Sequence, residues 1–101
     1  MGTDTFPSVV VVDDDDAGRE SLSWLIGSVG LSVKAFATPT EFLASDETER
    51  AGCLVLDVRL PEHGGLDVLE MLRERGIHTP TIMITAYGDI RAVVRAFRLG
   101  A

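Results

Sequence analysis

Residues 9–12 are four consecutive valines, and residues 13–16, which follow directly, are four aspartates. A short run of β-branched apolar residues between polar stretches predicts a strand that is buried on both faces, as central strands of parallel sheets are. The acids then lie at the carboxyl end of this strand. In open α/β sheets, ligands bind in the crevice beyond the carboxyl ends of the strands. The first sixteen residues therefore predict both a central strand and an acidic site at its end.

A second stretch repeats this design. Residues 53–56 are apolar and end in Asp57. If a strand–helix–strand connection makes the two strands parallel neighbours, their carboxyl ends meet at one edge of the sheet. We therefore expect Asp13, Asp14 and Asp57 to converge on one small pocket.

Length and composition restrict the class of protein. A chain of 101 residues with 46% hydrophobic residues corresponds to one globular domain, residues 1–101. The net charge of −7 argues against nucleic acid or an anionic membrane surface as a partner of this segment. A single cysteine, Cys53, cannot form an internal disulfide. The sequence shows neither a signal peptide nor a long apolar run, so we expect a cytoplasmic protein.

Apolar periodicity and turn residues predict strands that alternate with helices. Such alternation is typical of an α/β fold, a doubly wound parallel sheet with helices on both faces. We expect residues 45–50 to form a polar loop and Trp24 to lie partly in the core. Strands are predicted at residues 8–12, 31–36, 53–58 and 81–85, and helices at 17–29, after Thr38, from Leu66 to Gly76, and from Asp89 to Gly100.

The crowded carboxylates indicate a chemistry. Three carboxylates at one edge repel each other, and a bound cation relieves the repulsion. An all-oxygen site with room for water and phosphate suits Mg²⁺ better than Ca²⁺. Asp57 stands alone at the end of its strand and is the best candidate for a nucleophile that forms an aspartyl phosphate. Thr85, at the end of the fourth predicted strand, can donate its hydroxyl to a phosphoryl oxygen.

Two other functions fit less well. Asp13, Asp15 and Gly18 match the opening of an EF-hand calcium loop, but Trp24 stands at the twelfth position, where a bidentate Glu is needed. An Asp-nucleophile phosphatase of the haloacid dehalogenase type carries a second Asp two residues after the first. This chain has Arg59 there.

Three features together carry a family resemblance. They are the Asp13–Asp14 pair after a valine strand, residues 56–61 with Gly65 eight residues beyond Asp57, and Thr85–Ala86 at a strand end. With them, nearly the whole chain resembles the receiver domain of two-component response regulators. The resemblance implies a flavodoxin-like (CheY-like) fold with strand order 2-1-3-4 for the strands present. Residues 42–44, 56–61 and 96–101 are most similar to regulators with a LuxR-type helix-turn-helix output domain.

The resemblance also implies roles for individual residues. Asp57 would accept a phosphoryl group from a sensor histidine kinase, so the protein would be a signalling phosphoacceptor and not an enzyme beyond this self-catalysed transfer. Asp14 and Asp57 would bind Mg²⁺ through their side chains. Asp13 would act mainly through a bound water, and Arg59 would contribute its backbone carbonyl. Thr85 would be the switch residue that turns toward the phosphoryl group.

The chain departs from the family pattern after Ala101. Receivers continue with a fifth strand that carries an aromatic switch residue and a phosphoryl-binding Lys, then a fifth helix, whereas the only lysine here is Lys34. We therefore expect a receiver that is incomplete at its C-terminus and separated from its own output domain. A four-stranded sheet leaves the fourth strand as an open apolar edge, which predicts a homodimer or an exchange of elements. The alternative function is a non-switching interaction or dimerisation module.

Overall fold

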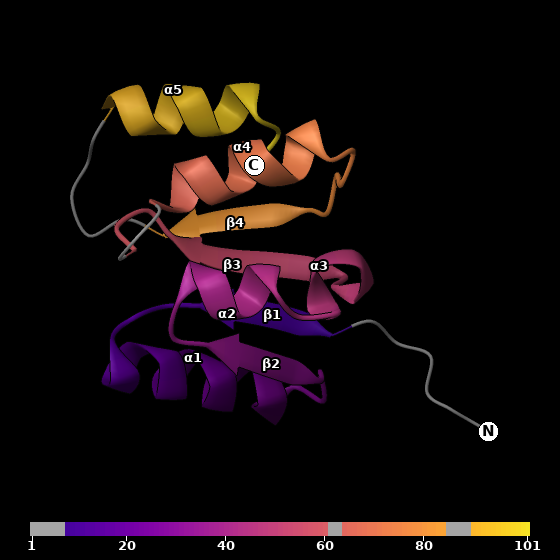
Figure 1. Ribbon diagram of the computed structural model, residues 1–101. Coiled ribbons are helices and arrows are strands. Elements are labelled where there is room, and N and C mark those ends of the chain that lie inside the picture. Colours follow the sequence, from indigo (N-terminus) through magenta and orange to yellow (C-terminus); the bar gives the residue numbers. More distant parts are fainter. Residues whose placement is uncertain (1–7, 61–63, 85–89) are drawn as a thin grey trace.

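The computed structural model describes residues 8–60, 64–84 and 90–101. Its centre is a four-stranded sheet of parallel strands in the order β2-β1-β3-β4 (Figure 1). This confirms the α/β class and the predicted order. The first three strands are slightly shorter than expected, and β2 loses most because Leu31 and Ser32 precede its first paired residue. The strands are β1 (Val9–Val12), β2 (Val33–Phe36), β3 (Cys53–Asp57) and β4 (Thr81–Ile84).

The helices follow the strands as the turn residues predict. The Thr38 hydroxyl accepts a hydrogen bond from the Glu41 N–H at 3.2 Å and caps the helix that begins at Pro39. Gly30 and Gly76 follow helices in the left-handed conformation, with φ of 89° and 78°. The predicted cap Asp89 lies outside the described residues. The helices are α1 (Asp16–Ser28), α2 (Pro39–Leu43), α3 (Glu47–Arg50), α4 (Gly65–Glu74) and α5 (Ile90–Arg98).

The expectation of a loop at residues 45–50 is wrong, because α3 occupies residues 47–50. Local side-chain bonds stabilise this turn. The Ser45 hydroxyl accepts from the Glu47 N–H at 3.2 Å, and the Thr48 hydroxyl donates to the Ser45 carbonyl at 3.3 Å. Thr48 is also buried, which anchors an otherwise polar segment. Hydrophobic periodicity does not detect a single turn of this kind.

The main core lies on one face of the sheet. Val10 and Val12 of β1 pack there with Leu54 and Leu56 of β3, since side chains on a strand alternate between faces. Phe42 of α2 and three residues of α4, Val68, Leu69 and Leu72, complete this fully buried group.

The opposite face is covered by α1, which packs against β1 and β2 and lies beside β2 in Figure 1. Leu22 and Ile26 are half-buried, but α1 has no fully buried residue. The expectation that Trp24 lies partly in the core is wrong, because 76% of its surface is exposed. At 100° per residue, Trp24 points about 200° away from Leu22 and therefore away from the sheet. No helix in the described ranges is long and apolar enough to cross a membrane.

Candidate functional site

The strand register brings the predicted acids together. Val12 pairs with Leu56, so Asp13 and Asp14 follow β1 beside Asp57, the last residue of β3. One carboxylate oxygen from each of these three residues lies within 4.8 Å of the others. Asp13 is buried, Asp57 is half-buried and Asp14 is exposed. The predicted convergence of the three side chains is therefore confirmed.

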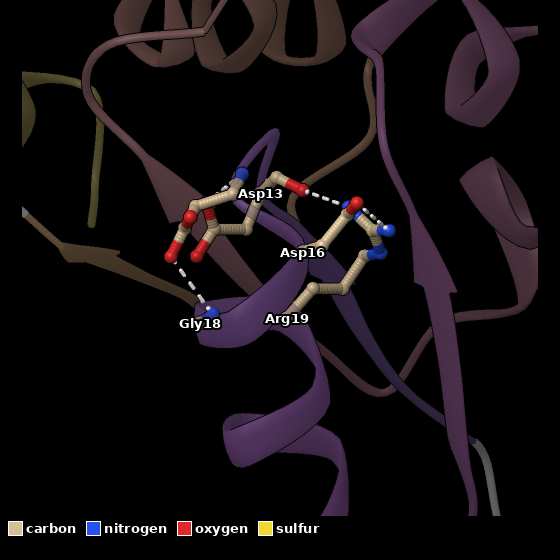
Figure 2. Close-up of polar contacts among 5 residues, drawn as sticks. Asp13, Asp16, Gly18 and Arg19 are labelled. Carbon is tan, nitrogen blue, oxygen red and sulfur yellow. Dashed lines mark hydrogen bonds and ion pairs between the residues drawn. The ribbon is translucent and has the colours of Figure 1, made fainter.

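Hydrogen bonds from the turn between β1 and α1, and from α1 itself, fix both the carboxylate and the carbonyl of Asp13. Its carboxylate accepts a hydrogen bond from the Asp15 N–H at 3.0 Å, and the Asp15 carboxylate caps α1 by accepting from the Gly18 N–H at 2.9 Å. The Asp13 carbonyl accepts from Nη1 of Arg19 at 2.9 Å, while Nη2 of Arg19 pairs with the Asp16 carboxylate (Figure 2). These bonds connect the strand end to the first two turns of α1.

Gly18 leaves room for this arrangement. A Cβ atom at position 18 would lie 2.9 Å from a carboxylate oxygen of Asp13 and equally close to one of Asp15. Such a separation is shorter than any ordinary carbon–oxygen contact. A side chain at this position would therefore displace the carboxylates from the start of α1.

Asp57 has an unusual electrostatic environment. Partial burial is the largest cause that raises the pKa of its carboxyl group above the ordinary value, and the negative charges of Asp13 and Asp14 add to it. A hydrogen bond of 2.9 Å from the Arg59 N–H to Oδ1, together with the charge of Arg59, acts in the opposite direction. Burial and the two neighbouring negative charges therefore both disfavour the ionised form of Asp57.

Gly65 explains the spacing of eight residues after Asp57. A Cβ atom at position 65 would lie only 2.1 Å from the backbone carbonyl oxygen of Asp57. The Gly65 N–H donates to the Val58 carbonyl at 2.9 Å, so the first turn of α4 packs directly against the end of β3. Only glycine permits this close approach, which fixes α4 beside the acidic cluster.

The donor set fits a hard divalent cation. Three carboxylates supply oxygen ligands, and their mutual repulsion favours an ion of opposite charge. The Arg59 N–H contacts the Asp57 carboxylate, and the role of the Arg59 carbonyl stays a prediction. Thr85 lies outside the described residues.

Arg19 was missed by the sequence interpretation, and its only signal was an opposite charge three residues after Asp16.

Comparison with known proteins identifies the family. The family model named response regulator receiver domain matches residues 9–101. The chain belongs to the response regulator receiver family. This receiver domain is 45% identical over 93 residues to the response regulator protein TodT of Pseudomonas putida, covering 92% of the receiver chain and 41% of TodT.

Two further comparisons agree. The receiver domain is 44% identical over 93 residues to the transcriptional regulatory protein FixJ of Azorhizobium caulinodans, covering 92% of this chain and 44% of FixJ. It superposes on the structure of the response regulator StyR with a TM-score of 0.86 and 43% identity, over 94% of this chain and 48% of StyR. The chain thus spans less than half the length of each of these relatives.

Proposed function

We propose that this receiver domain is the phosphoacceptor of a two-component response regulator, and that Asp57 is the residue phosphorylated. The observation that carries the proposal is the convergence of Asp13, Asp14 and Asp57 at the carboxyl ends of β1 and β3. An ionised Asp57 oxygen attacks the phosphorus of a phosphohistidine on a sensor histidine kinase. A new O–P bond forms an acyl phosphate, the N–P bond breaks, and the imidazole keeps its electron pair.

We infer that the transfer requires Mg²⁺. Asp14 and Asp57 would hold the ion through their side chains, Asp13 through a water molecule, and Arg59 through its carbonyl. When bound, the ion would neutralise the pocket and stabilise charge on the phosphoryl oxygens. The separation of at most 4.8 Å among the three carboxylate oxygens supports this assignment. The backbone N–H of Arg59 keeps the Asp57 carboxylate oriented.

Thr85 completes the proposed site. It follows Ile84, which pairs with Asp57 in the sheet. Its hydroxyl would donate a hydrogen bond to a phosphoryl oxygen on Asp57 and turn toward the modified residue as the switch. The support is its position in the sequence directly after β4 and the family resemblance.

The proposed readout is a change in an output region that binds DNA. The name of FixJ, a transcriptional regulatory protein, supports this, and this chain spans 44% of that protein. Under this proposal residues 1–101 form the receiver of a longer regulator. The net charge of −7 agrees with DNA contacts made by another region. The receiver would act as a signalling phosphoacceptor rather than an enzyme with a separate substrate.

We also propose that this chain associates with a second copy. Within the described part of the chain β4 pairs only with β3, which leaves one edge of β4 open. An open strand edge pairs readily with another chain. The contact would be a homodimer or an exchange of elements at this edge.

Intact mass after incubation with acetyl phosphate tests the phosphoacceptor proposal. We expect a gain of one phosphoryl group that requires Mg²⁺ and is lost in Asp57→Asn. The matched control is Asp46→Asn, because Asp46 is exposed and makes no side-chain cap bond. No gain in the unsubstituted protein would contradict the proposal and favour a non-switching interaction or dimerisation module.

A further inference from the structure

Arg19 connects two parts of the turn beneath the acidic cluster. Nη1 donates to the backbone carbonyl of Asp13 at 2.9 Å, and Nη2 of the same guanidinium pairs with the Asp16 carboxylate. The side chain of Arg19 is 22% exposed, whereas that of Asp16 is 85% exposed. In Figure 2 dashed lines join this guanidinium to the Asp13 carbonyl and to the Asp16 carboxylate. The partner that is held away from solvent is therefore the main chain of Asp13.

We infer that Arg19 is a positioning residue for the divalent cation, an inference that rests on the proposed function. Asp13 is the most buried member of the cluster, and its carboxylate is oriented by the N–H of Asp15 in the same turn. The Arg19 bond fixes the carbonyl of Asp13 and thereby the path of the chain through Asp14. Both cation-facing side chains of this turn depend on that path.

The positive charge of Arg19 and its hydrogen bond to the Asp13 carbonyl have opposite effects on Mg²⁺ affinity. A positive charge near the cluster repels an incoming dication, so removing that charge alone would tighten Mg²⁺ binding. Removing the bond to the Asp13 carbonyl loosens the turn and weakens binding. The direction of the change in affinity therefore separates a positioning residue from a nearby charge.

The shape of the side chain gives a second distinction. The planar guanidinium donates to the carbonyl and the carboxylate at the same time from two nitrogens. A lysine ammonium is a single charge on a flexible stem and reproduces this double contact poorly. Arg19→Lys keeps the charge and removes the double contact, whereas Arg19→Met removes both the charge and the double contact.

Titration calorimetry with Mg²⁺ alone tests the inference. Partners that orient metal ligands typically account for about tenfold or more in metal affinity, so we expect the Kd of Arg19→Met to rise about tenfold. Arg19→Lys is expected to lose Mg²⁺ affinity several-fold. Arg75→Met is the control, because Arg75 is exposed and ends α4 about 15 Å along the helix from Gly65. It makes the same change in net charge and should leave the Kd unchanged.

A second readout separates positioning from a loss of folding. With acetyl phosphate, Arg19→Met should need more Mg²⁺ for half-maximal phosphorylation but reach the rate of the unsubstituted protein when Mg²⁺ saturates. Unfolding of each variant in EDTA reports its stability without the ion. A general structural role would lower the saturated rate and the stability together.

The outcomes can be told apart. Tighter or unchanged Mg²⁺ binding in Arg19→Met, with normal binding in the unsubstituted protein and none in Asp57→Asn, would overturn the inference and leave the proposed function intact. Full Mg²⁺ affinity in Arg19→Lys would overturn the requirement for the double contact made by the guanidinium. Failure of the unsubstituted protein to bind Mg²⁺ would overturn the proposed function and the inference together.

Discussion

At the scale of single residues, the surroundings of Asp57 disfavour the ionised form of its carboxyl group. Its carboxylate is half-buried beside Asp13 and Asp14, and among the described residues the Arg59 N–H and the nearby Arg59 charge favour the ionised form. The folded protein therefore holds this group in a state of raised energy at neutral pH. A bound cation or a phosphoryl group with its cation would relieve this energy, which couples the chemistry of the site to stability.

This coupling predicts a pH-dependent effect of Asp57→Asn in EDTA. Because the pKa of Asp57 is higher in the folded than in the unfolded protein, its contribution to the unfolding free energy falls as pH rises through the folded pKa. The variant should be more stable than the unsubstituted protein at about pH 7, and the difference should shrink toward about pH 4, near the ordinary pKa of aspartate. Urea unfolding at both pH values measures this. A variant less stable at neutral pH would contradict the assigned electrostatics.

Two glycines should respond in opposite ways to alanine. Gly65→Ala places a Cβ 2.1 Å from the Asp57 carbonyl oxygen, so we expect a loss of about 3 kcal/mol or more in the unfolding free energy. Gly27→Ala lies in α1 with no atom within 4 Å of the new Cβ, and the better helix propensity should add about 0.5 kcal/mol. Urea unfolding of both variants provides the comparison. Equal effects would show that the close approach at α4 does not constrain the fold.

At the scale of elements, one arginine fastens α5 to α4. The Arg73 guanidinium donates to the carbonyls of Leu99 at 2.7 Å, Ile77 at 3.0 Å and Thr79 at 3.1 Å. Burial lowers the pKa of Arg73, yet arginine stays protonated in proteins. The exposed ion pairs of Arg95 with α4, by contrast, contribute little, because solvent screens them. Arg73 therefore determines where the end of α5 lies, beside α4 in Figure 1.

Arg73→Met should release the end of α5. Hydrogen bonds to a charged donor are each worth about 1.5–3 kcal/mol and are not additive, so we expect a loss of about 2–4 kcal/mol in stability. Hydrogen exchange should show faster exchange of the amides at Leu99 and Ala101, which bond to carbonyls within α5. Arg75→Met should change neither measurement. Unaltered exchange in Arg73→Met would show that α5 is held by its apolar contacts alone.

At the scale of the whole molecule, some apolar side chains are enclosed in the core and others are left exposed to solvent. The face that carries α2 and α4 encloses the core, while Ile82 on β4 and Phe97 on α5 are 57% and 76% exposed. A groove of about 330 Å³ lies between them and follows β4. Exposed apolar surface beside an open strand edge favours association with another chain.

Self-association should therefore depend on β4. Light scattering at increasing concentration is expected to show a dimer, and Ile82→Lys should return it to a monomer, because a charge on an edge strand blocks pairing. Trp24→Lys is the control, since Trp24 is also an exposed apolar residue but lies on α1. A monomer at high concentration would contradict the proposed contact. Loss of the dimer in Trp24→Lys alone would place the contact at α1.

The sequence by itself determined the alternation of strands and helices, the strand order that follows from the family resemblance, and the meeting of Asp13, Asp14 and Asp57. These depend on local periodicity and on the rule that parallel strands end at one edge. Tertiary structure decided the α3 turn, the close approach at Gly65 and the bond from Arg19 to the Asp13 carbonyl. Each of these depends on distances between backbone and side-chain atoms that packing sets. Residue patterns specify which face or end a residue occupies, but they do not specify how closely two segments approach.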